Sequence, residues 1–436
     1  MTVFTGAKNR KPCSAANLIR GMYMLKQRSF WVPVVCGILI LGLGSGTRQS
    51  FGIFQMAIAA DFGVGRELWS FANALSFLLM GLCAPFVGTL ADRFGTAKTA
   101  VVGGVLHVFG LLLLGFADSN WLLIFSCAIS GLGLSAAGMG PILAAIGRQT
   151  AVAHRSIALG LVTAGSSFGQ FGIVPFASLM QQSLGDWHNT MFVLTAISIF
   201  MIPAALGLGK NHTTDVSGQR IDGQGATEAL LEAFSVRSYV LLMIGFFVCG
   251  FHVIFIGLHL PAYIADAAIS MSYFGVTMSP IELGGWAIGI IGLFNIIGSV
   301  IWGWLGGIYK KKDMLALLYA LRSLAILLFL LVPLSWASVL FFAAILGFLW
   351  LGTVALTSGL IGFLFGPKHA AMLWGIVFLS HQVGSFLGGW GAGRWFDIEG
   401  NYDWVWLFSV AMGFVAAVLH WLIREEPVIR PKVSFA

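Results

Sequence analysis

One charged side chain interrupts the first long apolar stretch of the sequence. Arg48 lies within residues 31–59, a run long enough to cross a bilayer. A charge at mid-membrane depth is costly, so this side chain should face protein or water rather than lipid. The residues that share its stripe on a regular helix, at i+3, i+4 and i+7, are Phe51, Gly52 and Gln55. An arginine offers a carboxylate two parallel hydrogen bonds, which favours anion binding by Arg48; pairing with helix carbonyls or snorkelling is the alternative.

The carboxylates of the chain are distributed in a way that supports an anionic substrate. All 17 aspartates and glutamates lie near the expected ends of apolar segments or in the polar segments between them. A cation-binding or drug/proton antiporter would use an acid at mid-membrane depth. The interior field should therefore be positive, which favours an anion and argues against multidrug efflux.

Composition identifies the chain as a polytopic membrane protein. Hydrophobic residues make up 58% of its 436 residues and charged residues 9%, against about 25% charged in a soluble domain. We therefore expect an all-α membrane protein with twelve transmembrane helices. The apolar segments lie near residues 31–59, 68–90, 98–117, 121–147, 156–183, 189–208, 239–265, 283–307, 313–334, 336–366, 369–394 and 403–423.

The longest polar stretch divides these segments into six and six. The expected units are a tail (1–30), an N-terminal six-helix half (31–208), a central loop (209–238), a C-terminal six-helix half (239–423) and a second tail (424–436). Twenty of the 24 lysines and arginines lie on the side of the tails and the central loop. The positive-inside rule therefore predicts that both termini and the central loop are cytoplasmic, in the inner membrane if the source is bacterial.

The loop after the second apolar segment carries a compact charged motif, made of Gly88, Asp92, Arg93, Gly95 and Lys98. A tight turn with positive-inside charges would not need an acid and two glycines together. The motif resembles the signature loop of the major facilitator superfamily, in which the acidic and basic residues form a cytoplasmic network that steadies the outward-open state. The resemblance implies two pseudo-symmetric six-helix halves around a central site, and a gating role for the motif.

Spans four and five contain a second recognisable set of residues, which are Gly131, Leu132, Gly133, Pro141, Gly147, Arg148, Arg155, Ala158, Gly160, Ala164, Gly165 and Ser166. This set is similar to spans four and five of monocarboxylate transporters. Arg48 falls where that family has a functionally important lysine, and the wider group borders the oxalate/formate antiporters. The family's Asp/Arg pair of span eight is absent here, with Asn295 and Ser299 in its place, so its proton relay is not carried over.

Polar side chains in other spans complete the predicted substrate site. Such residues also hydrogen-bond neighbouring helices in membranes, which is the alternative for each of them. Arg322 lies roughly 13 Å into span nine, at 1.5 Å per residue, and has either a packing or gating role or a substrate contact. The predicted substrate-binding residues beside Arg48 are Gln55, Asn295, His252, Gln382 and Arg322.

Two histidines of span seven are candidates for a proton relay. His252 and His259 are seven residues apart and share one helix face. Histidine titrates near neutral pH and can carry a proton, although each can equally bond a neighbouring helix. His252 is expected to lie deeper and is the better candidate. A proton moving as undissociated acid would need neither.

We predict a secondary active transporter of a small organic anion, a monocarboxylate moved with a proton by alternating access. An exchanger of dicarboxylates and monocarboxylates is the alternative, and multidrug efflux fits less well. The sequence has no HExxH, CxxC or phosphate-cradling glycine loop, so no enzyme activity, metal or cofactor is expected. The expected partners are the anion, a proton and membrane lipid, with no nucleic acid and a monomer as the functional unit.

Overall fold

The computed structural model describes residues 28–150, 154–209, 225–273, 276–366 and 369–428. Its described part contains 12 helical segments long and apolar enough to cross a membrane, as the sequence predicted. The first runs from Phe30 to Phe62 and the last from Asp403 to Trp421, close to the expected ranges. The expected tail 1–30 falls mostly outside the described residues, as does the greater part of the second tail.

The N-terminal half begins with a span made of three pieces, the helix α2, the 3-10 segment η1 and the helix α3. Its other spans are α4, α5, the pair α6 and α7, the helix α8, and the pair α9 and α10. The bounds are α2 (Arg28–Gln49), η1 (Ser50–Phe54), α3 (Gln55–Phe62), α4 (Glu67–Phe94), α5 (Thr96–Gly115), α6 (Asn120–Ala136), α7 (Met139–Gln149), α8 (Arg155–Leu184), α9 (Trp187–Ser198) and α10 (Met201–Leu206).

The C-terminal half repeats this plan. Span ten is divided into α15 and α16, as span four is divided into α6 and α7. A short antiparallel hairpin, β1 with β2, lies in the loop between α12 and α13. The bounds are α12 (Arg237–Asp266), β1 (Met271–Tyr273), β2 (Val276–Met278), α13 (Pro280–Ile308), α14 (Lys311–Leu331), α15 (Trp336–Phe348), α16 (Gly352–Phe365), α17 (Ala370–Glu399) and α18 (Asp403–Trp421).

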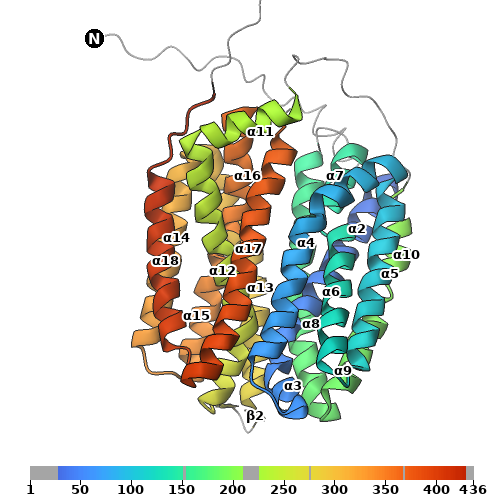
Figure 1. Cartoon of the computed structure of the whole chain (residues 1–436), viewed down its shortest axis with the longest axis vertical. Helices are drawn as coiled ribbons and strands as arrows, with labels where there is room; N and C mark the ends of the chain where they lie inside the picture. Colours follow the sequence, from blue (N-terminus) through green and yellow to red (C-terminus); the bar gives the residue numbers. More distant parts are fainter. Residues whose placement is uncertain (1–27, 151–153, 210–224, 274–275, 367–368, 429–436) are drawn as a thin grey trace, which may run out of the picture.

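The two halves stand side by side with their helices roughly parallel (Figure 1). One further helix, α11 (Ala226–Ser235), lies within the predicted central loop and crosses one end of the C-terminal half (Figure 1). We call this the α11 end of the molecule. The opposite end, where α3 and α9 lie, we call the α3 end (Figure 1).

Glycines allow helices to pack closely inside each half. A Cβ at Gly169 of α8 would collide with the backbone of Gly42 in α2, and one at Gly388 of α17 would lie 2.5 Å from the carbonyl oxygen of Phe251 in α12. The first contact joins α2 to α8, and the second joins α12 to α17. These contacts agree with the small-residue packing expected between membrane helices.

Side chains also connect the two halves directly. The Gln170 amide of α8 donates to the carbonyl oxygen of Ile288 in α13 at 3.0 Å, and Ser178 donates to that of Ile281 at 3.0 Å. Gly81 of α4 lies directly against Gln382 of α17. The interface therefore includes the pairs α8 with α13 and α4 with α17.

Candidate functional site

Arg48 lies where the first span changes from an α-helix to a 3-10 helix. Hydroxyls on both sides of it bond backward to the helix: Thr47 donates to the Leu43 carbonyl oxygen at 2.7 Å and Ser50 to that of Gly46 at 2.8 Å. Such back-bonding bends helices, and short 3-10 pieces often mark functional hinges. The local sequence therefore places the charge beside an irregular point of the span.

The guanidinium of Arg48 is held by α4. It lies over the Phe77 ring, 3.1 Å from its centroid, and donates to Met80 Sδ at 3.1 Å and Ser76 Oγ at 3.5 Å. The residue is 9% exposed, and its Nε has no hydrogen-bond partner. The ion pairs between described residues do not include it. Arg48 is thus a buried cation with weak partners and unused donor capacity.

Gln382 reaches the same place from the C-terminal half. Its Nε2 donates to the carbonyl oxygen of Phe77 at 3.1 Å, and its Oε1 lies 2.9 Å from Nδ1 of His381. Arg48 and Gln382 therefore contact the same residue, Phe77, one at its ring and the other at its carbonyl oxygen. Of the residues predicted to bind substrate, these two are brought together by the structure.

Asn295 forms a different link between the halves. Its Nδ2 donates to Ser167 Oγ at 2.8 Å, and its Oδ1 accepts from the backbone N–H of Leu351 at 3.0 Å. Leu351 lies at the break between α15 and α16. Asn295 therefore connects span ten to α8, and both ends of its amide are occupied.

Gln55 does not share the surroundings of Arg48, contrary to the predicted single stripe. Its Nε2 donates to Ser70 Oγ at 3.1 Å and lies 3.2 Å from Nδ1 of His259, while its Oε1 is buried without a partner. The stripe assumed 3.6 residues per turn, but the intervening 3-10 segment has about three. The two side chains consequently contact different parts of α4.

Arg322 and His252 make contacts within the C-terminal half. Arg322 Nη2 donates to the carbonyl oxygens of Leu349 and Trp350, the latter at 2.6 Å, and Nη1 lies 3.6 Å from Cys249 Sγ. These carbonyls end α15, so the guanidinium caps the broken span ten. His252 Nε2 is 2.8 Å from the carbonyl oxygen of Ser409 in α18. The structure brings neither side chain to Arg48.

Span two contains polar residues that the sequence reasoning did not select. Ser76 and Met80 contact Arg48 directly, and Asn73 is 2% exposed with an Oδ1 that has no partner. Ser70, Asn73 and Phe77 recur at i, i+3 and i+7. A search along span two for polar side chains at helical spacing would have found Ser70 and Asn73, but not the contacts of Phe77 and Met80 with Arg48.

The charged motif after span two forms a tight connection between α4 and α5. Gly95 has φ 96°, a conformation that disfavours a side chain, and its N–H bonds the Ala91 carbonyl oxygen at 3.0 Å. Arg93 and Lys98 are exposed, whereas the side chain of Asp92 lies outside the described part of the chain. Arg148 of span four donates to Thr96 Oγ1 at 2.9 Å. The gating role of the motif stays a prediction.

At the α3 end, an ion pair joins the two halves. Arg66 Nη1 and Nη2 donate to the two oxygens of Asp266 at 2.8 and 2.5 Å, and its carbon Cζ lies 3.6 Å from the Phe396 ring centroid. Burial lowers the pKa of Arg66, but the hydrogen bonds to Asp266 and Tyr402 raise it more. Asp397 accepts from the backbone N–H of Arg66 at 2.7 Å. Sequence reasoning placed these groups in loops but did not pair them.

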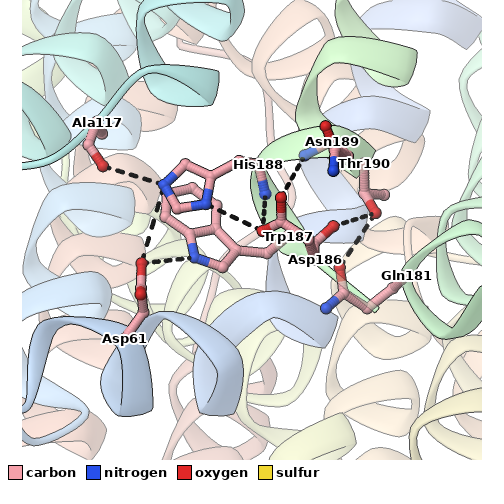
Figure 2. Close-up of polar contacts among 8 residues, drawn as sticks. All are labelled: Asp61, Ala117, Gln181, Asp186, Trp187, His188, Asn189 and Thr190. Carbon is pink, nitrogen blue, oxygen red and sulfur yellow. Dashed lines mark hydrogen bonds and ion pairs between the residues drawn. The ribbon is translucent and has the colours of Figure 1, made fainter. Parts of the chain in front are cut away.

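A second polar cluster at the α3 end lies within the N-terminal half (Figure 2). Asp186 caps α9 by accepting from the backbone N–H groups of His188 and Asn189, at 3.1 and 3.4 Å. The imidazole of His188 lies between Asp186, at 3.0 Å, and Asp61 of α3, at 3.8 Å (Figure 2). Partial burial raises the pKa of Asp186, but the bonds from His188 and Asn189 outweigh it, so the pKa lies below its usual value.

Among the described residues, histidine, cysteine and carboxylate side chains form no group of three or more that is arranged to hold a metal ion. The candidate site therefore consists of a buried guanidinium, an aromatic ring and amide groups. Such a set can bind and orient an anion.

Twelve spans in two packed halves, with a buried arginine beside their interface, are the features of a polytopic membrane transporter. The chain belongs to the Major Facilitator Superfamily, whose family model matches residues 34–285 and 267–435. This confirms the family, the fold and the prediction of a transporter rather than an enzyme. The chain is an integral, multi-pass membrane protein.

Relatives within the family are distant. The oxalate:formate antiporter of Oxalobacter formigenes is 23% identical over 407 residues, which cover 89% of this chain and 90% of the antiporter. Monocarboxylate transporter 12 of Rattus norvegicus is 24% identical over 414 residues, covering 88% of this chain and 82% of that one. A bacterial homolog of the human lysosomal transporter Spinster, solved in an inward-facing and unoccupied conformation, has a similar fold, with a TM-score of 0.71 at 15% identity over 91% of this chain and 97% of that one.

Proposed function

We propose that this chain is a secondary active transporter that moves a small monocarboxylate with a proton by alternating access. The observation that carries the proposal is Arg48, a buried cation that no described carboxylate pairs and whose Nε has no partner. A cation in low dielectric without a counter-charge is costly, and an incoming carboxylate would relieve that cost. Both relatives described above are named for small organic anions, which supports the class of substrate.

The number of unoccupied cationic groups favours a substrate with one carboxylate over a substrate with two. A dicarboxylate exchanger would use a second buried cation, and Arg322 is the obvious candidate. Its Nη2 is already occupied by the carbonyl oxygens of Leu349 and Trp350. Arg48 therefore offers the better site, for one carboxylate. Exchange of organic anions remains the alternative outcome of the transport test below.

We further infer that the α11 end faces the cytoplasm, because the basic residues gather on that side. The ion pair between Arg66 and Asp266 then lies at the outer end. Side-chain links of Gln382 with Phe77 and of Asn295 with Ser167 lie nearer the middle of the spans. In this orientation the described arrangement is closed on its outer side.

Ligand binding tests the role of Arg48. Purified wild type, Arg48→Gln and the surface control Arg394→Gln are screened for thermal stabilisation by a panel of organic acids. We expect at least one monocarboxylate to stabilise wild type and Arg394→Gln but not Arg48→Gln. An acid that stabilises all three equally would remove Arg48 from the site.

Transport by reconstituted protein tests the coupling. Uptake of the same acid is measured in vesicles with and without an inward proton gradient, and with and without organic acid inside. Symport predicts uptake into empty vesicles that the gradient accelerates. Uptake that requires internal acid and ignores the gradient would identify an exchanger instead.

A further inference from the structure

A hydrogen-bonded chain crosses between the two halves at the α3 end. Arg66 Nη1 donates to the hydroxyl oxygen of Tyr402 at 2.9 Å, and that hydroxyl lies 3.0 Å from Nδ1 of His259. Gln55 Nε2 lies 3.2 Å from the same Nδ1 and donates to Ser70 Oγ. Arg66, Gln55 and Ser70 belong to the N-terminal half, whereas Tyr402 and His259 belong to the C-terminal half. His259 is therefore the central group of an inter-half network.

The surroundings of His259 determine which of its nitrogens carries hydrogen. Nε2 lies 2.9 Å from the carbonyl oxygen of Gly389, which can only accept, so Nε2 must donate. Nδ1 faces the amide N–H₂ of Gln55 and the hydroxyl of Tyr402. The Tyr402 oxygen already accepts from Arg66, so its own hydrogen is available to Nδ1. His259 is consequently neutral in this arrangement, with Nδ1 as the acceptor.

If Nδ1 of His259 took up a proton, its N–H would face the N–H₂ group of Gln55, so that two donors would point at each other. The unpartnered atom of that amide, Oε1, provides a way to relieve this conflict. Reversing the amide by a half-turn lets Oε1 accept from Nδ1–H, and it directs the two N–H donors to where the unpaired oxygen lay. Gln55 would then present donors in place of an acceptor.

The charged groups near His259 provide no counter-charge of its own. Arg66 is the nearest cation, and both oxygens of Asp266 are occupied by it. Asp397 accepts from backbone N–H groups of Arg66 and Glu67. The other contacts of the imidazole, from α3, α17 and α18, are the neutral amide of Gln55, a backbone carbonyl and the Tyr402 phenol. A protonated His259 would therefore add unbalanced positive charge to the interface, which an incoming anion would offset.

His252, the other histidine of span seven, has different surroundings. It is also fully buried, but its Nε2 bonds the Ser409 carbonyl oxygen within the C-terminal half, and its Nδ1 has no partner. Protonation of His252 would change no described hydrogen bond between the halves. It is a matched control on the same helix.

We propose that His259 is the proton-binding group of this transporter, that Gln55 stabilises its protonated form by reversing its amide, and that the added positive charge at the interface favours binding of the anion. This inference rests on the proposed function. It identifies the residue that couples proton binding to transport, for which the sequence offered two histidines. Proton binding at Nδ1 would raise the affinity for the anion, and the anion would raise the affinity for the proton by the same factor.

The pH dependence of transport tests the proposal. Uptake of a monocarboxylate that stays ionised throughout is measured in proteoliposomes between about pH 5.5 and pH 8, a range around the ordinary histidine pKa. For wild type we expect KM to rise, up to about tenfold per pH unit, once the site loses its proton. His259→Gln should give a flat KM profile, and His252→Gln should keep the wild-type slope. Counterflow of labelled acid at fixed pH should survive in the control His252→Gln, and in His259→Gln it reports whether that variant folds and transports.

Gln55→Met is a second variant that leaves His259 in place. It should also flatten the KM profile, because methionine has no amide oxygen that could accept from Nδ1–H of a protonated His259. It decides the question if His259→Gln does not fold or transport. A slope that survives in either His259→Gln or Gln55→Met, a slope lost in His252→Gln, or a flat wild-type profile would each overturn the proposal. Absence of counterflow in wild type for every acid would instead refute the proposed function.

Discussion

The substitution Asp266→Asn replaces one carboxylate oxygen of the Arg66–Asp266 ion pair and should let the two halves separate more often at the α3 end. Breaking a buried ion pair costs about 3–5 kcal/mol, whereas exposed pairs contribute about 0.2–1 kcal/mol. Arg66 is 7% exposed and the Asp266 side chain 31%, and Arg66 keeps its contacts with Tyr402 and Phe396. We therefore expect Asp266→Asn to cost about 2 kcal/mol. The pair joins the halves, so this energy is lost only from arrangements closed at the α3 end, and the open population should rise about thirtyfold.

A cysteine in place of Ser178 reports this opening. Ser178 is 1% exposed and donates to Ile281 across the interface between α8 and α13, so a thiol there should react only when the halves separate. In a variant without the native cysteines, a membrane-impermeant maleimide applied from the α3 end should label Ser178→Cys about thirtyfold faster when Asp266→Asn is present.

The exposed pair between Arg394 and Glu67 provides the matched control. Arg394 is 56% exposed and Glu67 36%, and the pair also joins the two halves. Arg394→Gln should change the labelling rate by no more than about fivefold, because exposed pairs contribute about 1 kcal/mol at most. Equal labelling rates for wild type and Asp266→Asn, or a larger effect from Arg394→Gln, would refute the assignment of Arg66–Asp266 as the main lock of this end.

Two further predictions concern stability. Arg322→Met should destabilise the protein by roughly 3 kcal/mol in unfolding measured in detergent, because the Leu349 and Trp350 carbonyl oxygens lose their donor. The anion should still stabilise this variant. A stable variant that no longer binds the anion would instead place Arg322 in the site. Asp186→Ala should lose about 1 kcal/mol at neutral pH, since the carboxylate caps α9. Because the folded pKa of Asp186 is depressed, its contribution is full above the unfolded pKa of about 3.9 and disappears as pH falls through the folded pKa. Wild type and Asp186→Ala should therefore converge in unfolding midpoint in acid, and a constant difference at all pH values would contradict this account.

The sequence by itself determined the membrane class, the twelve spans and the unusual position of Arg48. These follow from local properties, since apolar runs of spanning length and a charge within one of them are visible without knowing any neighbour. The motif around Gly95 was equally local, because a positive φ in a tight turn favours glycine in any context.

Only the tertiary structure decided which side chains meet. Gln55 and His259 are 204 residues apart, and Arg66 and Asp266 are 200 apart. Their pairing depends on the rotation and depth of each helix, which hydropathy does not specify. The 3-10 segment after Arg48 shifted Gln55 away from the predicted stripe, and packing of α14 against the broken span ten occupied Nη2 of Arg322. The charge of each residue was visible in the sequence, but its free hydrogen-bonding capacity was set by packing.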